Sequence, residues 1–421
     1  MNVMVVGGGG REHAIIKSLV KNPKVTALYA LPGNGGIGKE ATCVAVGAKD
    51  IPGMVQFAKD HQIEFAVVAP DDPLVMGAVD ALEEAGVTCF GPNKAAAAIE
   101  GSKVFSKELM KKYGIPTAQY QVFEDAAAAI AYIKAQNSYP AVIKADGLAL
   151  GKGVIIAENE KAAIEGVHKI MTERAFGDSG NRVVIEEFLT GPEVSVLSFT
   201  DGKTLVPMVS SMDHKRALDG DRGPNTGGMG TVAPNPFYTP EVEKVCMETI
   251  FLPTIQAMAA EGRPFKGCLY FGLMLTEKGP RVIEYNCRFG DPETQVVLPL
   301  LKTDLLTIMQ AVAEERLADI KVEFESGAAC CVVLASGGYP GKYPTGYPIS
   351  FGTVEEMKDV TVFHAGTKEV NGQIVTSGGR VLGVTATGKD IAAARALAYK
   401  AAKEISFTDV FYRKDIGARC S

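Results

Sequence analysis

The chain has 421 residues, of which 47% are hydrophobic and 22% are charged, and its net charge is −6. This length predicts several domains with sizeable cores, and the composition excludes a disordered chain. The negative charge argues against a nucleic-acid partner, because neutralising phosphates requires a basic surface. No apolar run is long enough to span a bilayer, no basic leader precedes the first apolar run, and the 8 cysteines lack C-x-x-C spacing. We therefore expect a cytoplasmic protein without a membrane partner, with reduced thiols.

From residue 1 to about 101, strand-like runs alternate with helical patterns. The runs are NVMVV, VTALYAL, FAVVAP and TCFGP, and the helical stretches lie near 11–22, 52–61 and 73–86. This order predicts an α/β domain over 1–101 with a doubly wound parallel sheet. Ligands on such sheets bind beyond the carboxyl ends of the strands, where a glycine turn follows the first run.

That turn, GGGGREHA, departs from the dinucleotide-binding fingerprint. Its third glycine position is Glu12, and the second strand-like run ends without an acidic residue. The N-terminus of a helix still attracts anions, and Arg11 adds a positive charge. The pattern favours a small phosphorylated ligand over NAD, and a ligand-free structural turn is the alternative.

The pattern changes after Gly101. A helix is expected around 102–113, followed by two strand-like runs joined by GLALGKG, a helix near 159–172 and the strand RVVIEEFL. GLALGKG lacks the Ser or Thr and the strand-to-helix context of a Walker A loop, but a glycine-rich hairpin with a lysine can close over phosphates as a lid.

Antiparallel signals come next. Asp201-Gly202 predicts a hairpin turn between two apolar runs. The stretch 217–230, ALDGDRGPNTGGMG, contains too many turn-forming residues for regular structure. A helix over about 239–261 precedes the strand pair GCLYFGLML and RVIEYN, and short strands with a final helix over 390–405 predict a small α+β domain at the end of the chain.

The stretch RVIEYNCRFGDPE carries the clearest chemistry. In an extended chain, Glu284, Asn286 and Arg288 share one face, and the intervening residues share the other. A carboxylate beside an amide oxygen suits Mg²⁺ that is shared with nucleotide phosphates. A solvated polar edge is the alternative, but the apolar flanks favour the metal.

Other charged residues fit a nucleotide less specifically. Lys103 and Lys144 can neutralise phosphate oxygens, and the backbone after Glu186 can read an adenine edge. No nucleophile–base pair is evident, because His214 and the adjacent Asp213 point to opposite faces of an extended chain.

Six motifs follow one another along the chain: GGGGREHA, GSK, VIKADGLALGKGV, IEEFLTGPEVSV, DHKRALDGDRGPNTGGMG and VIEYNCRFGDPETQ. In this order they resemble the phosphoribosylamine–glycine ligase family of the ATP-grasp superfamily, and the resemblance covers essentially the whole chain. The resemblance implies an N-terminal α/β domain (1–101), a two-part ATP-grasp core (102–122 and 191–325), a lid subdomain (123–190) and a C-terminal α+β domain (326–421). It also implies an enzyme of purine biosynthesis that joins glycine to 5-phosphoribosylamine, with ATP as co-substrate and Mg²⁺ or Mn²⁺ as cofactor.

The resemblance also assigns residues. It gives ATP the side chains or backbone of Lys103, Lys144, Gly151, Lys152, Gly153, Glu186, Glu187, Phe188, Leu189 and Glu193. It gives the metal Glu284 and Asn286, and it gives the substrates Gly8, Gly9, Gly10, Arg11, Glu12, Lys215 and Asp291. From residue chemistry we expect Arg288 to pair with the carboxylate of glycine and Asp213 to hold its ammonium group, so that Lys144, Arg288 and Asp213 are the catalytic candidates.

Some alternatives stay open. GCLYFGLML offers no second metal carboxylate, so two bound ions are not implied. Another ATP-grasp ligase, a nucleotide-binding sensor without turnover and a dehydrogenase are the competing functions. We expect a monomer or a weak dimer.

Overall fold

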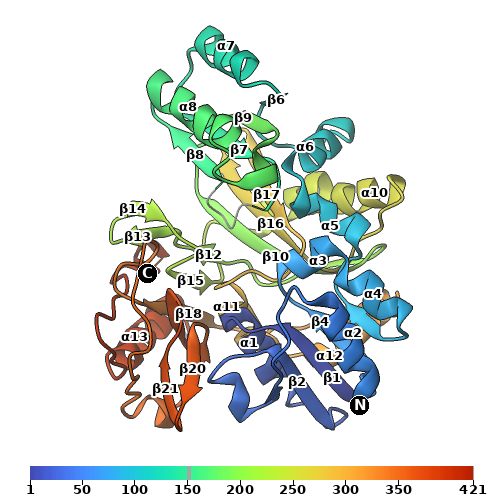
Figure 1. Cartoon of the computed structure of the whole chain (residues 1–421), viewed down its shortest axis with the longest axis vertical. Coiled ribbons are helices and arrows are strands. Elements are labelled where there is room, and N and C mark those ends of the chain that lie inside the picture. Colours follow the sequence, from blue (N-terminus) through green and yellow to red (C-terminus); the bar gives the residue numbers. More distant parts are fainter. Residues whose placement is uncertain (149–152, 421) are drawn as a thin grey trace.

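The computed structural model describes residues 1–148 and 153–420. Four sheets of four or five strands and two two-stranded hairpins organise the described residues into a lower body and an upper lobe (Figure 1). The mixed α/β and α+β fold class expected from the sequence is confirmed.

The N-terminal sheet is parallel, in the order β3-β2-β1-β4-β5. Its strands are β1 (Asn2–Gly7), β2 (Ala27–Pro32), β3 (Thr42–Cys43), β4 (Phe65–Val68) and β5 (Thr88–Phe90). The helices are α1 (Gly10–Leu19), α2 (Ile51–Asp60), α3 (Asp71–Met76), α4 (Ala78–Glu84) and α5 (Lys94–Gly101). The single helix expected near 73–86 is two helices, because Gly77 adopts a left-handed φ of 97° between them.

A second sheet forms the middle of the molecule, in the antiparallel order β11-β10-β16-β17. Its strands are β10 (Glu193–Asp201), β11 (Leu205–Pro207), β16 (Lys266–Thr276) and β17 (Gly279–Asn286). The predicted helix 239–261 is confirmed as α9 (Pro240–Cys246), a π-helical turn (Met247–Phe251) and α10 (Leu252–Ala260). The predicted hairpin at Asp201-Gly202 is also confirmed.

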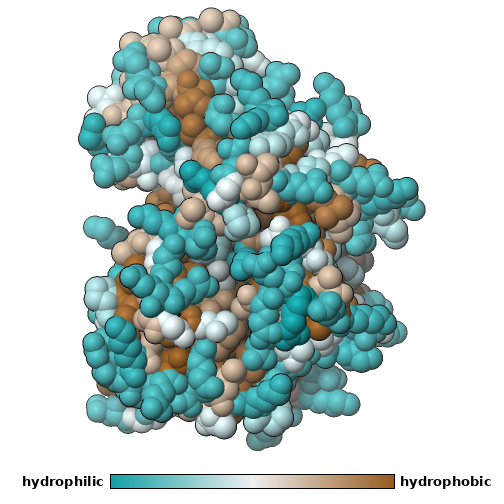
Figure 2. All heavy atoms as spheres, turned by 90° about the vertical axis from the view of Figure 1, so that its right-hand side faces the viewer, coloured by the Kyte–Doolittle hydropathy of each residue, from teal (hydrophilic) through white to brown (hydrophobic). Residues whose placement is uncertain are grey.

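The upper lobe, Tyr120–Glu187, is built on the sheet β6-β9-β7-β8. Its elements are β6 (Tyr120–Phe123), α7 (Ala126–Gln136), β7 (Ala141–Ala145), β8 (Val154–Ala157), α8 (Glu160–Val167) and β9 (Val183–Glu187), and α6 (Lys103–Lys112) lies below it. The lobe has a small core of its own around Ile133, Ile143 and Ile185. Polar side chains cover most of the face seen in Figure 2, where the outline narrows between the lobe and the body.

The last sheet has the order β12-β15-β18-β22-β19. Its strands are β12 (Met212–Asp213), β15 (Gly230–Ala233), β18 (Ala328–Ala335), β19 (Val360–His364) and β22 (Arg380–Gly388), and α13 (Ile391–Ala402) is the final long helix. Two of these strands, β12 and β15, come from the middle of the chain. They therefore attach the polar segment between them to the C-terminal domain.

That polar segment contains regular structure, so the expectation for 217–230 is wrong. The short strands β13 (Arg216–Leu218) and β14 (Arg222–Asn225) pair as a hairpin whose turn contains Asp221 and Gly220 at positive φ. The hairpin forms because Asp and Gly tolerate the left-handed conformations that tight turns need. A second hairpin, β20 (Thr367–Val370) with β21 (Gln373–Thr376), turns at Asn371-Gly372.

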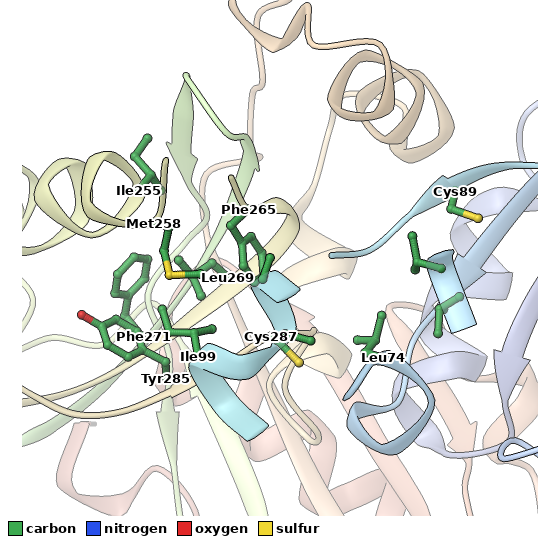
Figure 3. Close-up of a cluster of buried hydrophobic side chains, with 14 of the residues drawn as sticks. Leu74, Cys89, Ile99, Ile255, Met258, Phe265, Leu269, Phe271, Tyr285 and Cys287 are labelled. Carbon is green, nitrogen blue, oxygen red and sulfur yellow. The ribbon is translucent and has the colours of Figure 1, made fainter. Parts of the chain in front are cut away.

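A hydrophobic cluster joins the N-terminal domain to the middle sheet (Figure 3). Leu74 and Ile99 from α3 and α5 belong to the same buried cluster as Phe271 and Tyr285 from β16 and β17. Burying each such side chain contributes about 1.5–3 kcal/mol. The cluster therefore fixes the end of α5 against β17. Within the described residues, no helix is long and apolar enough to cross a membrane.

Candidate active site

The glycine turn (residues 7–12) follows β1 and is held by Glu12. The buried carboxylate of Glu12 accepts the Gly9 N–H at 2.7 Å and the Arg11 Nε–H at 2.8 Å. A Cβ on Gly8 would overlap the carbonyl oxygen of Gly33, so only glycine fits there. The five residues 8–12 that the sequence assigned to the phosphorylated substrate thus form one ordered turn at the start of α1.

Two partners of this turn come from distant parts of the chain. Nδ2 of Asn34 donates to the carbonyl oxygen of Gly8 (2.9 Å) and to that of His364 in β19 (2.8 Å). The carboxylate of Asp291 accepts the Arg11 backbone N–H at 3.3 Å. The turn is therefore tied both to the C-terminal domain and to the segment that follows β17.

Arg380 is a further partner that the sequence analysis missed. Its Nη1 donates to the carbonyl oxygens of Gly227 and Asp291, both at 2.8 Å, and lies 3.5 Å from Oδ1 of Asp291. The signal in the sequence was an arginine that directly follows Gly378-Gly379 and opens an otherwise apolar strand.

A cluster of lysines lies between the middle sheet and the upper lobe. Nζ of Lys103 donates to the Gly147 carbonyl oxygen at 2.7 Å, and Nζ of Lys144 donates to that of Ile283 at 3.2 Å. Nζ of Lys215 lies 3.4 Å from Oε1 of Glu284. The three ammonium groups all act on the carboxylate of Glu284, and lysines grouped in this way suit the oxygens of a polyphosphate.

The neighbouring lysines keep Glu284 ionised. Burial alone raises the pKa of Glu284, but Lys215, Lys144 and Lys103 more than offset this and lower it to about 2. The Coulombic attraction of Glu284 in turn raises the pKa of Lys215. Glu284 is therefore a carboxylate at every physiological pH.

The upper lobe supplies a second group of charges. The buried carboxylate of Glu186 lies 2.9 Å from Nζ of Lys144 and 3.0 Å from Nζ of Lys107. Lys107, which was not singled out from the sequence, lies on α6 with its side chain pointing inward, and it also donates to Thr117 Oγ1 at 2.8 Å. The side chain assigned to adenine is thus fixed between two lysines.

The segment after Glu186 connects the two sheets. Glu187 ends β9, where it accepts the Gln119 N–H at 2.9 Å, and Phe188 and Leu189 follow in an extended stretch, with Phe188 exposed. Glu193 opens β10, with its carboxylate 3.9 Å from Lys215 Nζ. Gly153 lies at the base of the lid hairpin and accepts the Ala145 N–H, while Gly151 and Lys152 lie outside the described residues.

Glu284 and Asn286 meet the chemical requirements of a magnesium site. Nδ2 of Asn286 donates to Glu100 at 2.7 Å, which leaves Oδ1 as an acceptor. The described residues contain no cluster of three or more His, Cys, Asp or Glu side chains that could hold a metal. One carboxylate and one amide oxygen fit Mg²⁺, which keeps water and substrate phosphate as its other ligands. Gly272 pairs with Glu284 in the neighbouring strand, so no second carboxylate lies opposite it.

Arg288 follows this pair and is held by the N-terminal domain. Its Nη2 lies 3.3 Å from Glu100 and 3.9 Å from Asp71. Its Nε is buried and without a hydrogen-bond partner among the described residues. The guanidinium therefore keeps one donor for an incoming anion.

Two carboxylates form the opposite side of the site. Burial and the charge of Glu293 raise the pKa of Asp213 well above its usual value. Glu293, which the sequence analysis did not select, is buried and accepts from Ser195 Oγ at 3.3 Å. An ammonium group would relieve the repulsion between these two carboxylates.

His214 has a structural role, consistent with the sequence. Its Nδ1 lies 3.1 Å from the Gly230 carbonyl oxygen, and its Nε2 accepts the Gly417 N–H at 3.1 Å. Burial and the nearby Arg413 lower its pKa to about 4, so the ring is neutral at pH 7. It connects β15 to the end of the chain and forms no dyad with Asp213.

The middle sheet and the sheet of the upper lobe, with a lysine cluster between them and a Glu-x-Asn pair at the end of β17, define a protein of the ATP-grasp class. The comparisons agree with this class. A crystal structure of biotin carboxylase from Campylobacter jejuni matches with a TM-score of 0.75 over 99% of this chain and 98% of that one, at 15% identity.

The chain belongs to the phosphoribosylglycinamide synthetase family, as the resemblance in its sequence indicated. The N, ATP-grasp and C domain models of that family match residues 1–100, 101–294 and 329–419. Phosphoribosylamine–glycine ligases of Caldanaerobacter subterraneus and Escherichia coli O157:H7 are 48% and 47% identical, over 99% and 100% of this chain and 100% and 98% of theirs. The crystal structure of the Thermotoga maritima phosphoribosylamine–glycine ligase matches with a TM-score of 0.87 at 36% identity, over 99% of this chain and all of that one.

Proposed function

We propose that this protein uses ATP to ligate glycine to 5-phosphoribosylamine, giving glycinamide ribonucleotide, ADP and phosphate. The observation that carries the proposal is the course of residues 284–291. This segment begins at Glu284 and Asn286 beside the lysine cluster and ends at Asp291, which accepts the Arg11 N–H of the glycine turn. One short stretch of chain thus joins a nucleotide site to a site for a phosphorylated amine.

The first step is transfer of the γ-phosphoryl group to the carboxylate of glycine. Glu284 and Asn286 would hold Mg²⁺ or Mn²⁺, and the bound ion would neutralise phosphate charge. Lys103 and Lys144 hold phosphate oxygens, and positioning with charge neutralisation suffices for this kind of transfer. Arg288 pairs with the carboxylate that is to be phosphorylated.

The second step is attack by the amine of phosphoribosylamine on the carbonyl of glycyl phosphate, which expels phosphate. The glycine turn and Arg11 hold the ribose phosphate at the N-terminus of α1. Asp213 holds the ammonium of glycine, with Lys215 and Asp291 beside the substrates. The acyl phosphate is prone to hydrolysis, so the upper lobe closes over the site to exclude water.

The four-part division of the chain inferred from the resemblance fits this mechanism. The N-terminal part (1–101) contributes the glycine turn, and the core (102–122 and 191–325) contributes the metal-binding side chains Glu284 and Asn286. The lid (123–190) contributes Glu186 for adenine. The C-terminal part (326–421) contributes Arg380 and His364, which support the glycine turn and Asp291. A cytoplasmic monomer or weak dimer acting on these small molecules completes the proposal.

The test is ADP release with glycine present, with and without phosphoribosylamine formed in situ from ribose 5-phosphate and ammonia. Turnover that needs both substrates and yields glycinamide ribonucleotide supports the proposal. ADP release with a different carboxylate, and none with glycine, would replace the substrate and keep the ATP-grasp class. The variants Lys144→Ala and Glu284→Ala then locate the phosphoryl transfer.

A further inference from the structure

We propose that Glu100 is a positioning residue that fixes which way the amide of Asn286 points, so that Oδ1 and not Nδ2 faces the divalent cation. The inference rests on the proposed function, because that function places the cation at Glu284 and Asn286. Glu100 belongs to α5 of the N-terminal domain and comes three residues before Lys103.

The geometry around Glu100 is closely determined. Its Oε1 accepts from Nδ2 of Asn286 at 2.7 Å, and its Oε2 accepts the backbone N–H of Cys287 at 2.7 Å. Nη2 of Arg288 lies 3.3 Å from Oε1 and supplies a counter-charge. The carboxylate is only 8% exposed, so protein groups and not water occupy its lone pairs.

The chemistry of the two side chains sets the orientation. Both oxygens of Glu100 face donors, Oε2 the Cys287 N–H and Oε1 the guanidinium of Arg288, so Glu100 accepts here and the amide turns its NH₂ group towards it. The carbonyl oxygen Oδ1 then lies on the opposite side of the amide. The two ends of an amide have nearly the same shape, so the hydrogen-bond partner selects the orientation, as outer groups commonly do around metal ligands.

The backbones on both sides are fixed independently. Ile99 and Cys287, the neighbours of Glu100 and Asn286, lie in the hydrophobic cluster of Figure 3 and are almost completely buried. The hydrogen bond between the two side chains thus joins two rigid elements, α5 and the end of β17. A displacement of the main chain cannot easily relieve a mismatch there.

The first test variant is Glu100→Gln. When its amide oxygen accepts the fixed Cys287 N–H, its NH₂ faces the NH₂ of Asn286. Asn286 then rotates by half a turn and presents NH₂ to the cation. We expect the affinity for Mn²⁺ in the presence of ADP, measured by electron paramagnetic resonance of free Mn²⁺, to fall about 10- to 100-fold. ADP binding in EDTA should be unchanged.

The second variant exchanges the pair, as Glu100→Gln/Asn286→Asp. The glutamine amide now donates to the aspartate and still accepts the Cys287 N–H, and the aspartate offers a carboxylate oxygen to the cation. The orientation is restored although Glu100 is absent. We expect the Mn²⁺ affinity of the double variant to exceed that of the single variant by at least tenfold.

A matched control is Asp201→Asn. Asp201 is also a buried carboxylate that accepts backbone N–H groups, those of Lys203, Thr204 and Leu317, but it lies at the other end of β10 from Glu193. This variant should lower the melting temperature and leave the Mn²⁺ affinity unchanged. It separates metal positioning from general damage to buried carboxylates.

The outcomes are distinct. A single variant that binds Mn²⁺ like the wild type would overturn the proposal, and so would a double variant no better than the single one, because restoring the donor–acceptor match between residues 100 and 286 would then have no effect. Recovery in the double variant supports it. The proposed function is judged separately, by glycine-dependent ADP release from the wild type, and its failure would not alter the Mn²⁺ comparison.

Discussion

Oε2 of Glu186 lies 3.0 Å from Nζ of Lys107, and both side chains are almost completely buried. The pair connects the upper lobe, through β9, to α6 below it. Burial lowers the pKa of Lys107 to about 8, although the charge of Glu186 acts in the opposite direction. An ion pair at this place holds the carboxylate that we assign to adenine.

Lys107→Met tests this pair. The variant leaves Glu186 with Lys144 as its single cationic partner, and the loss of one hydrogen bond to a buried charge should lower the free energy of unfolding by about 2 kcal/mol. The KM for ATP should rise while the KM for glycine is unchanged. Lys112→Met is the control. Lys112 lies on the same helix as Lys107 and forms an exposed ion pair with Glu261, so this variant should change neither the free energy of unfolding nor the KM for ATP. An unaltered KM for ATP in Lys107→Met would show that this ion pair has no role in adenine binding.

His214 predicts a dependence of stability on pH. Its pKa is about 4 in the folded protein, against 6.5 for a histidine side chain that is free in water. Between these values the unfolded chain binds the proton and the folded protein does not, so stability falls as the pH drops from about 6.5 to 4. The shift corresponds to about 3 kcal/mol.

The measurement compares melting temperatures at pH 7 and pH 5. The wild type should lose more stability on acidification than His214→Gln, which has no group that titrates there. His168→Gln, at an exposed histidine, should follow the wild type. Equal losses in the wild type and His214→Gln would show that another group dominates the acid response.

Gly8 predicts a steric effect on the glycine turn. In Gly8→Ala the new Cβ overlaps the carbonyl oxygen of Gly33, and relieving such overpacking typically costs about 1–3 kcal/mol. We expect a lower melting temperature and a KM for phosphoribosylamine raised more than that for ATP. Gly47→Ala, where no atom lies within 4 Å of the new Cβ, is the neutral control. A wild-type KM in Gly8→Ala would place the phosphorylated substrate elsewhere.

Asp213 predicts how glycine binding responds to charge. Removing one partner of a buried charge pair costs about 2–5 kcal/mol, so Asp213→Asn should raise the KM for glycine at least tenfold with a smaller change in the KM for ATP. Because the pKa of Asp213 is raised, the KM of the wild type for glycine should also increase as the pH falls. This dependence of the KM on pH should be weaker in Asp213→Asn. A glycine KM that Asp213→Asn leaves unchanged would exclude Asp213 from that role.

Local patterns were enough to predict part of this site. Alternation along one strand grouped Glu284 with Asn286, and the glycine turn was recognisable from consecutive residues. Glu100, Asn34 and Arg380 could not be found in this way, because their partners are remote in sequence; Glu100 and Asn286 are 186 residues apart. Only the packing of separate domains brings such groups together.

The two hairpins also differ in how well local sequence predicts them. Asn371-Gly372 is a turn signal that sequence reasoning could have used, and the structure places a hairpin there. The hairpin of β13 and β14 has a weaker local signal. It is held by partners outside it, such as Arg413, whose Nη1 donates to the Arg216 carbonyl oxygen and lies 2.9 Å from Oδ1 of Asp221.

The link from Asn34 to Gly8 and His364 has a consequence for biosynthesis on the ribosome. The glycine turn is translated well before one of its supports, because the supporting carbonyl oxygen of His364 follows 330 residues after Asn34. At about 5–20 residues per second, the turn waits roughly 20 to 70 s for this partner. A nascent chain that ends before His364 therefore has an incompletely supported glycine turn, so that this support arrives only after His364 has been translated.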